Sequence, residues 1–114
     1  MSGHRNKVRI IGGQWRSRQV EFADQAALRP TPDRIRETLF NWLRDHLIGA
    51  RCLDLFAGSG VLGIEALSRG AAQVAFVDNH AQAIQGIASQ CTKLGVTDAD
   101  FYHQDVMVFL QTTT

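Results

Sequence analysis

The spacing of hydrophobic residues along this chain of 114 residues changes character twice. Near the N-terminus, two runs rich in β-forming residues, Lys7–Ile11 and Gln14–Phe22, flank Gly12-Gly13. This pattern predicts a β-hairpin with a two-residue turn. Because an isolated hairpin is only marginally stable in water, we expect it to pack against the rest of the chain or against a ligand.

A helical pattern follows, in which Thr31 is the expected N-cap, Pro32 takes the first helical position and Gly49 ends the helix. Apolar residues recur on one face of this helix, which we expect to be buried: Ile35, Leu39, Trp42, Leu43 and Leu47. Charged residues fall mainly off that face, which indicates an amphipathic helix.

From Arg51 onward, short apolar runs alternate with helical segments. The predicted order is a strand at 51–57, a helix at 60–69, a strand at 73–77, a helix at 81–94, a strand at 100–103 and a helix starting at 106. This order indicates an α/β fold with a parallel sheet of the Rossmann type. We expect a single domain made of a basic hairpin extension at 1–28, a helix at 29–49 and the first half of a cofactor-binding unit at 50–110.

Charge is divided unevenly along the chain. Residues 1–44 contain nine Lys or Arg and four Asp or Glu, whereas residues 45–114 contain three and seven. A basic segment joined to an acidic remainder is typical of a polyanion-binding segment attached to a different kind of site. A solvated basic face would explain the same charge pattern.

The composition also suggests a compartment. No apolar run reaches the about 20 residues needed to cross a bilayer, and the N-terminal residues lack the apolar region of a signal peptide. Cys52 and Cys91 have neither metal-ligand nor C-x-x-C spacing, and Cys91 falls on the apolar face of a predicted helix. We expect a cytoplasmic protein with two reduced thiols, no metal and no membrane partner.

Gly58, Gly60 and Gly63 form a G-x-G-x-x-G motif between a predicted strand and a predicted helix. Glycine allows a sharp turn and lets a ligand reach the main chain, and the helix points its free N–H groups at that ligand. Asp78 follows Gly58 by twenty residues, the usual position of an acid that binds ribose hydroxyls. The motif predicts a ribose-bearing cofactor, the alternative being a tight turn without a ligand.

Asp54 distinguishes between possible cofactors. A dinucleotide would place its pyrophosphate on the glycine loop, close to this carboxylate, whereas S-adenosyl-L-methionine carries a sulfonium and an ammonium group and no phosphate. Asp105, beyond the third strand, is placed to accept a hydrogen bond from an adenine amino group. Each acid also has a structural interpretation, as a cap of a turn for Asp54 or of the next helix for Asp78, beside Asn79, and for Asp105.

Three stretches together resemble the bacterial RsmD family: VRIIGGQWRSR, LRPTPDRIRETLFNWL and CLDLFAGSGVLGIEALSRGA. Members of this family are S-adenosyl-L-methionine-dependent methyltransferases that modify the exocyclic N2 of a guanine in 16S ribosomal RNA. The resemblance covers roughly Val8 to Leu110, and its first two stretches are more specific than the glycine loop. It implies a Rossmann-like class I methyltransferase fold.

The resemblance also implies roles for individual residues. The cofactor loop would consist of Asp54, Phe56, Ala57, Gly58, Ser59 and Gly60, with Asp54 near the methionine end. Asp78 would bind the ribose with Asn79 beside the adenosine, Asp105 and Val106 would flank the adenine, and Arg29, Pro30 and Thr31 would close over the cofactor. The hairpin would grip phosphates of 16S rRNA or of the small ribosomal subunit through Arg5, Lys7, Arg9, Arg16 and Arg18, while Trp15 would pack against the core or stack on a base.

One departure from the family pattern concerns catalysis. The family places an Asp/Asn-Pro-Pro-aromatic motif after its fourth strand, and the prolines here are Pro30 and Pro32 alone. We therefore expect a fold truncated after about three parallel strands, with no catalytic residues of its own and little or no turnover. The first strand of the sheet would then be an edge, which favours self-association.

Two other functions remain open. An NAD-dependent oxidoreductase would share the same half-fold, although Asp54 and the basic hairpin argue against it. A non-catalytic RNA-binding module would use the basic segment alone.

Overall fold

The structure, a computed structural model, describes residues 5–23, 32–55 and 57–113. The elements are β1 (Arg5–Arg9), β2 (Gln19–Ala23), α1 (Asp33–Leu47), β3 (Arg51–Leu55), α2 (Val61–Ser68), β4 (Gln73–Asp78), α3 (Ala81–Leu94), β5 (Ala99–His103) and α4 (Val106–Thr113). The alternation of strands and helices predicted from Arg51 onward is confirmed. None of the helices described is long and apolar enough to span a membrane.

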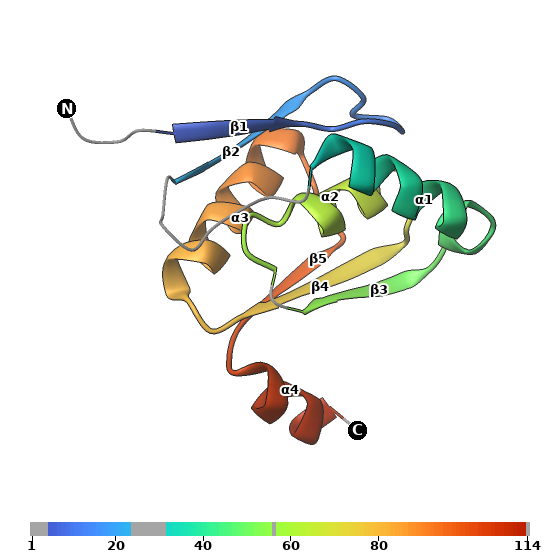
Figure 1. Ribbon diagram of the computed structural model, residues 1–114. Helices are drawn as coiled ribbons and strands as arrows, with labels where there is room; N and C mark the ends of the chain where they lie inside the picture. The colour runs from blue at the N-terminus through green and yellow to red at the C-terminus, as the bar shows by residue number, and fades with distance from the viewer. Residues whose placement is uncertain (1–4, 24–31, 56, 114) are drawn as a thin grey trace.

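Strands β3, β4 and β5 form a parallel sheet in that order, and β1 and β2 form a separate antiparallel pair. Figure 1 shows the pair on the outside of the molecule, α1, α2 and α3 in a layer beneath it, and then the sheet, with α4 on the sheet's other face. This arrangement is Rossmann-like, and it brings the carboxyl ends of the three strands to one edge, beside the N-termini of α2 and α3.

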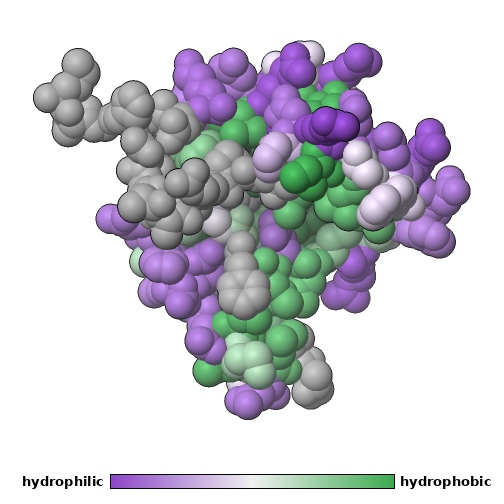
Figure 2. All heavy atoms as spheres, viewed as in Figure 1, coloured by the Kyte–Doolittle hydropathy of each residue, from purple (hydrophilic) through white to green (hydrophobic). Residues whose placement is uncertain are grey.

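The main core lies between the sheet and the helical layer. Ile64 of α2, Phe76 of β4 and Ile87 of α3 are fully buried there, and Phe76 stacks on Phe101 of β5. A smaller cluster around Val77 and Phe109 joins the other face of the sheet to α4. In Figure 2, hydrophilic side chains cover the hairpin at the top, and hydrophobic side chains gather below, over the sheet and α4.

The expected two-residue turn at Gly12-Gly13 is wrong. β1 ends at Arg9 and β2 begins at Gln19, so a nine-residue connection joins them. The ladder continues only as far as Ile10, whose N–H donates to Arg18 O at 2.8 Å and whose carbonyl accepts from Ser17 N. The rest of the connection leaves the ladder because its amides bind another element.

That element is α2, which holds the connection through Glu65 and Ser68. The two carboxylate oxygens of Glu65 accept from the N–H groups of Ile11 and Gly12, at 3.0 and 2.9 Å. The carbonyl of Ser68 accepts from Gln14 N at 2.8 Å. A sequence pattern cannot show these partners, which lie more than fifty residues along the chain.

The predicted buried face of α1 is also wrong in part. Leu47 is buried, but Ile35 and Trp42 are exposed, Trp42 by 76%, and the buried residues of this helix include Arg36 and Phe40. Arg36 reaches inward because its guanidinium donates to Glu65, to the carbonyl of Arg9 and to Asp33. Pro32 stands at the N-cap position rather than inside the helix, and the expected cap Thr31 lies outside the described residues.

Candidate functional site

The glycine loop follows β3 and leads into α2. Gly58 and Gly60 adopt positive φ angles of 57° and 79°, which favour glycine. Ala57 N donates to Val77 O at 2.9 Å, which ties the loop to the end of β4. The loop therefore lies at the carboxyl edge of the sheet, where the sequence predicts a ligand site.

Two of the three glycines are also required for packing. A Cβ on Gly60 would lie 2.7 Å from the side chain of Ile87, and a Cβ on Gly63 would lie 2.3 Å from the ring of Phe76. These glycines let α2 approach α3 and β4 closely, so the motif has a structural role in addition to any contact with a ligand.

Asp78 lies at the end of β4 and binds the glycine loop directly. Its Oδ2 accepts from Gly58 N at 3.0 Å, and its Oδ1 accepts from His80 N at 2.9 Å. The His80 ring approaches Oδ1 as well, with Nδ1 at 3.0 Å. Burial acts to raise the pKa of Asp78, but these hydrogen bonds outweigh it and hold the pKa below its usual value. Asp78 does not take the N-cap position of α3, which His80 occupies, although its side chain accepts from the N–H of His80.

Asp54 points to the same end of the molecule from β3. Its Oδ2 accepts from Gly63 N, in the first turn of α2, at 3.1 Å. Burial raises the pKa of Asp54 to about 7, and the nearby charge of Asp78 acts in the same direction. The two acids thus have pKa values moved apart, one ionised over a wide pH range and the other titrating near neutrality.

Main-chain N–H groups at the N-terminus of α2 already donate to side-chain oxygens of the protein. Gly63 N donates to Asp54, and Val61 N has a long contact of 3.4 Å to Ser59 Oγ. The partial positive charge of a helix N-terminus normally attracts phosphate. Here a carboxylate of the protein lies beside it, which disfavours a phosphate-bearing ligand and favours a cationic one.

Residues expected around the adenine have structural roles as well. Asp105 Oδ1 accepts from Met107 N and Val108 N at 2.9 and 3.2 Å, so Asp105 caps α4. Val106 is buried beside Val77, which leaves its main chain but little of its side chain for a ligand. Asn79 is exposed at the same edge. Phe56, Arg29, Pro30 and Thr31 lie outside the described residues.

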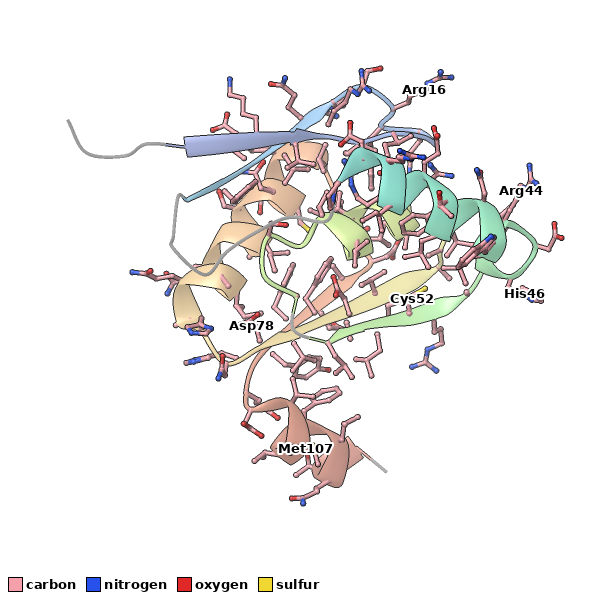
Figure 3. All side chains as sticks on the ribbon, in the orientation of Figure 1. Arg16, Arg44, His46, Cys52, Asp78 and Met107 are labelled. Carbon is pink, nitrogen blue, oxygen red and sulfur yellow. The ribbon has the colours of Figure 1, made fainter. Side chains whose placement is uncertain are left out.

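The basic residues of the hairpin are spread over its length. Lys7 and Arg9 alternate with Val8 on β1 and are exposed. Arg16 and Arg18 both lie in the connection, where Arg18 Nη2 reaches Lys93 O, near the end of α3. Figure 3 shows Arg16 far from Asp78, because the connection sits at the C-terminal ends of α2 and α3. The side chain of Arg5 lies outside the described part of the structure.

Trp15 packs against the main core and is partly buried, which is one of the two roles expected for it. Two residues of importance escape the sequence analysis, namely Glu65 and His80. For His80 a signal exists, since an Asp side chain often accepts from the backbone N–H two residues further along the chain. For Glu65 the only hint is an acid among the apolar residues of a short helix.

The family model described as Conserved hypothetical protein 95 matches residues 8–114. Ribosomal RNA small subunit methyltransferase D of Escherichia coli (strain K12) is 46% identical over 104 residues, which are 91% of this chain and 52% of that protein. The chain thus spans about half the length of this curated relative.

Solved structures share the fold. The yhhF protein of Escherichia coli has a TM-score of 0.85 and 42% identity over 92% of this chain and 56% of its own. The PRMT1 enzyme–prozyme complex of Trypanosoma brucei, solved with AdoHcy, has a TM-score of 0.58 over 69% of this chain and 24% of its own. At 23% identity, the second likeness shows the fold alone.

Proposed function

The chain belongs to the family described as Conserved hypothetical protein 95, the RsmD family, and from this premise we propose that it is the cofactor-binding half of an enzyme that methylates ribosomal RNA. The name of its Escherichia coli relative, a ribosomal RNA small subunit methyltransferase, supports this reaction. The finer proposal is methylation of the exocyclic N2 of a guanine in 16S rRNA, which follows from the family resemblance of the sequence.

S-adenosyl-L-methionine is the proposed cofactor, and it supplies an electrophilic methyl group when bound. Asp78 would accept from its ribose hydroxyls, beside Asn79, and the loop from Ala57 to Gly60 would offer its main chain. Asp54 would face the cationic methionine end. Phe56, Arg29, Pro30, Thr31, Asp105 and Val106 complete the proposed set.

The observation that carries this proposal is the pair of carboxylates around the glycine loop. Asp54 accepts a hydrogen bond from the N–H of Gly63 in the first turn of α2, and Asp78 accepts one from the N–H of Gly58. A pyrophosphate placed there would meet the ionised Asp78 and, as the pH reaches about 7, an ionised Asp54 as well, whereas a sulfonium and an ammonium group would be attracted by these charges. The arrangement therefore supports an S-adenosyl ligand over NAD.

For RNA, we propose that the solvent-facing side of the hairpin binds phosphates through Lys7, Arg9, Arg16 and Arg18, together with Arg5. Lys7 and Arg9 lie on β1, and Arg16 and Arg18 lie in the connection, where Arg18 reaches Lys93 O near the end of α3. An RNA bound along them would therefore contact the whole length of the hairpin, and its affinity would fall with added salt.

The transfer step itself needs groups that hold the guanine amino nitrogen in line with the methyl group. The family supplies them with an Asp/Asn-Pro-Pro-aromatic motif, which this sequence lacks. The 114-residue chain would therefore bind the cofactor and RNA but transfer few methyl groups by itself. A methyl-transfer assay on hypomethylated small-subunit RNA that showed robust turnover would contradict this part of the proposal.

The cofactor assignment is tested by calorimetry of the chain with S-adenosylhomocysteine and with NADH. We expect heat with the first ligand only, and we expect Gly58→Val to abolish it. Gly95→Val is the matched control, because Gly95 also has a positive φ of 78° but lies at the C-terminus of α3, where no atom of the described residues is within 4 Å of its added Cβ. Heat with NADH alone would favour the oxidoreductase, and RNA binding without either ligand would favour the non-catalytic module.

A further inference from the structure

His80 stands at the carboxylate that the proposed cofactor needs. Its side chain is 72% exposed, yet its ring nitrogen Nδ1 lies 3.0 Å from Asp78 Oδ1, while the side chain of Asp78 is only 9% exposed. Because an ionised carboxylate only accepts hydrogen bonds, Nδ1 carries the proton in this contact. The exposed ring thus covers part of an otherwise buried acceptor.

The acceptor capacity of Asp78 can be counted. A carboxylate has about four lone-pair sites, two on each oxygen. Oδ1 receives two donors, His80 N at 2.9 Å and His80 Nδ1, and Oδ2 receives Gly58 N at 3.0 Å. Among the described residues, these contacts leave one site, on Oδ2. A ribose diol offers two O–H donors, so the second donor has no site while the ring remains in place.

We propose that the imidazole of His80 is a gate on the ribose-binding acid, and that it must leave Asp78 Oδ1 before both ribose hydroxyls can bind there. The two main-chain donors cannot move away easily, because Gly58 N belongs to the glycine loop and His80 N to the turn that leads into α3. The ring can move, since it is largely in solvent. This inference rests on the proposed function, and it makes His80 a positioning residue that lowers the affinity for the cofactor.

Removal of the ring should therefore tighten binding. A single hydrogen bond from a largely exposed ring contributes little, so we expect His80→Ala to bind S-adenosylhomocysteine about two- to fivefold more tightly than the unmodified chain. His103→Ala is the matched control, because His103 lies at the same edge and contacts Asn79 O at 3.2 Å rather than Asp78. We expect its affinity to equal that of the unmodified chain.

A second measurement separates a gate from a general effect on folding. The 2′-deoxy and 3′-deoxy analogues of S-adenosylhomocysteine each present a single hydroxyl, which the remaining site on Oδ2 can accept. We expect His80→Ala to leave the affinity for both analogues unchanged, while it raises the affinity for the complete ribose. Isothermal titration calorimetry on the full chain measures all of these values.

The outcomes are distinct. If the unmodified chain binds S-adenosylhomocysteine and His80→Ala binds it equally or more weakly, the gate is wrong and the proposed function stands. An equal gain for the deoxy analogues would also contradict the gate. If neither protein binds the ligand, the proposed function fails, and the gate fails with it.

Discussion

Glu65 is a fully buried acid whose partners come from three different elements. Its carboxylate accepts from the amides of Ile11 and Gly12, from Arg36 Nη1 at 3.0 Å and from Arg69 Nε at 2.9 Å. The same side chain therefore joins the hairpin connection, α1 and α2. Buried charges of this kind are costly when one partner is removed, because the remaining charges keep their desolvation penalty.

Replacement of Glu65 by Gln should strongly destabilise the fold. The amide keeps the size of the side chain, but its NH2 group must face an N–H or a guanidinium that needs an acceptor. We expect a loss of about 3–5 kcal/mol in the free energy of unfolding, measured in urea. Glu37→Gln, the same change at an exposed position of α1, should stay within about 0.5 kcal/mol. Equal effects at the two positions would show that the buried cluster contributes nothing.

Asp54 predicts a pH dependence of stability. Its pKa is about 7 in the folded chain against 3.8 for the unperturbed group. Between about pH 4 and pH 7, Asp54 is therefore protonated in the folded chain and ionised in the unfolded chain. Stability from this group is complete below pH 4 and is lost as the pH rises towards 7. The loss amounts to about 2 kcal/mol, because water beside the partly buried side chain screens part of the penalty.

The variant Asp54→Asn should remove this dependence, since its amide oxygen can still accept from Gly63 N. We expect equal stability of the two proteins at pH 4 and a more stable variant at pH 8, measured by urea unfolding at both values. The same change should weaken S-adenosylhomocysteine binding. A variant that follows the pH profile of the unmodified chain would exclude Asp54 as the titrating group.

At the scale of elements, local sequence patterns predict the helices and strands whose boundaries do not depend on contacts with distant residues. The glycines at 60, 70 and 95 and the apolar run of β4 mark boundaries by themselves, and the elements from Arg51 to His103 follow from them. The buried side of α1 could not be predicted, because Arg36 is drawn inward by Glu65, 29 residues further along. Asp54 and Asp78 were placed correctly at the sheet's edge, but the sequence could not show that each already accepts a main-chain N–H.

The attachment of the hairpin to α2 can be tested at Gly13. This residue has a φ of +82°, and an added Cβ would lie 1.9 Å from the carbonyl oxygen of Ser68. Gly13→Ala should therefore detach the connection from α2, beyond the about 1–2 kcal/mol that positive φ alone costs. Gly49→Ala provides that reference, because Gly49 has a φ of +77° and, in the part of the chain that the structure describes, no atom within 4 Å of its added Cβ. Urea unfolding of the two variants gives the comparison, and equal losses would contradict the attachment.

At the scale of the whole molecule, β3 forms one edge of the sheet in the described part of the chain. A groove of about 330 Å³ runs between this strand and α1, lined mainly by apolar residues such as Leu39, Leu43 and Leu62. On the strand itself, Leu53 is 46% exposed. An open strand with apolar surroundings is a site for pairing with another chain.

We therefore expect the isolated chain to self-associate through β3 as its concentration rises, measured by sedimentation equilibrium. Leu53→Lys should shift the equilibrium towards the monomer, because a charge on an edge strand opposes pairing. Val108→Lys is the control, since Val108 is about equally exposed but lies on α4. A monomer at all concentrations, or an equal effect of the two lysines, would place any association elsewhere.

Helix α2 connects two features that lie at its opposite ends. Its eight residues span about 12 Å. The glycine loop precedes Val61, and the residues that bind the hairpin connection, Glu65 and Ser68, lie further along the helix. Insertion of one residue between the glycine loop and Glu65 would rotate Glu65 and Ser68 by about 100° around the helix axis and turn Glu65 away from Gly12. The glycine loop and the hairpin connection are therefore held at a fixed distance and orientation by α2. A designer who moves the basic hairpin to another Rossmann-like scaffold must transfer this helix with it, in the same register.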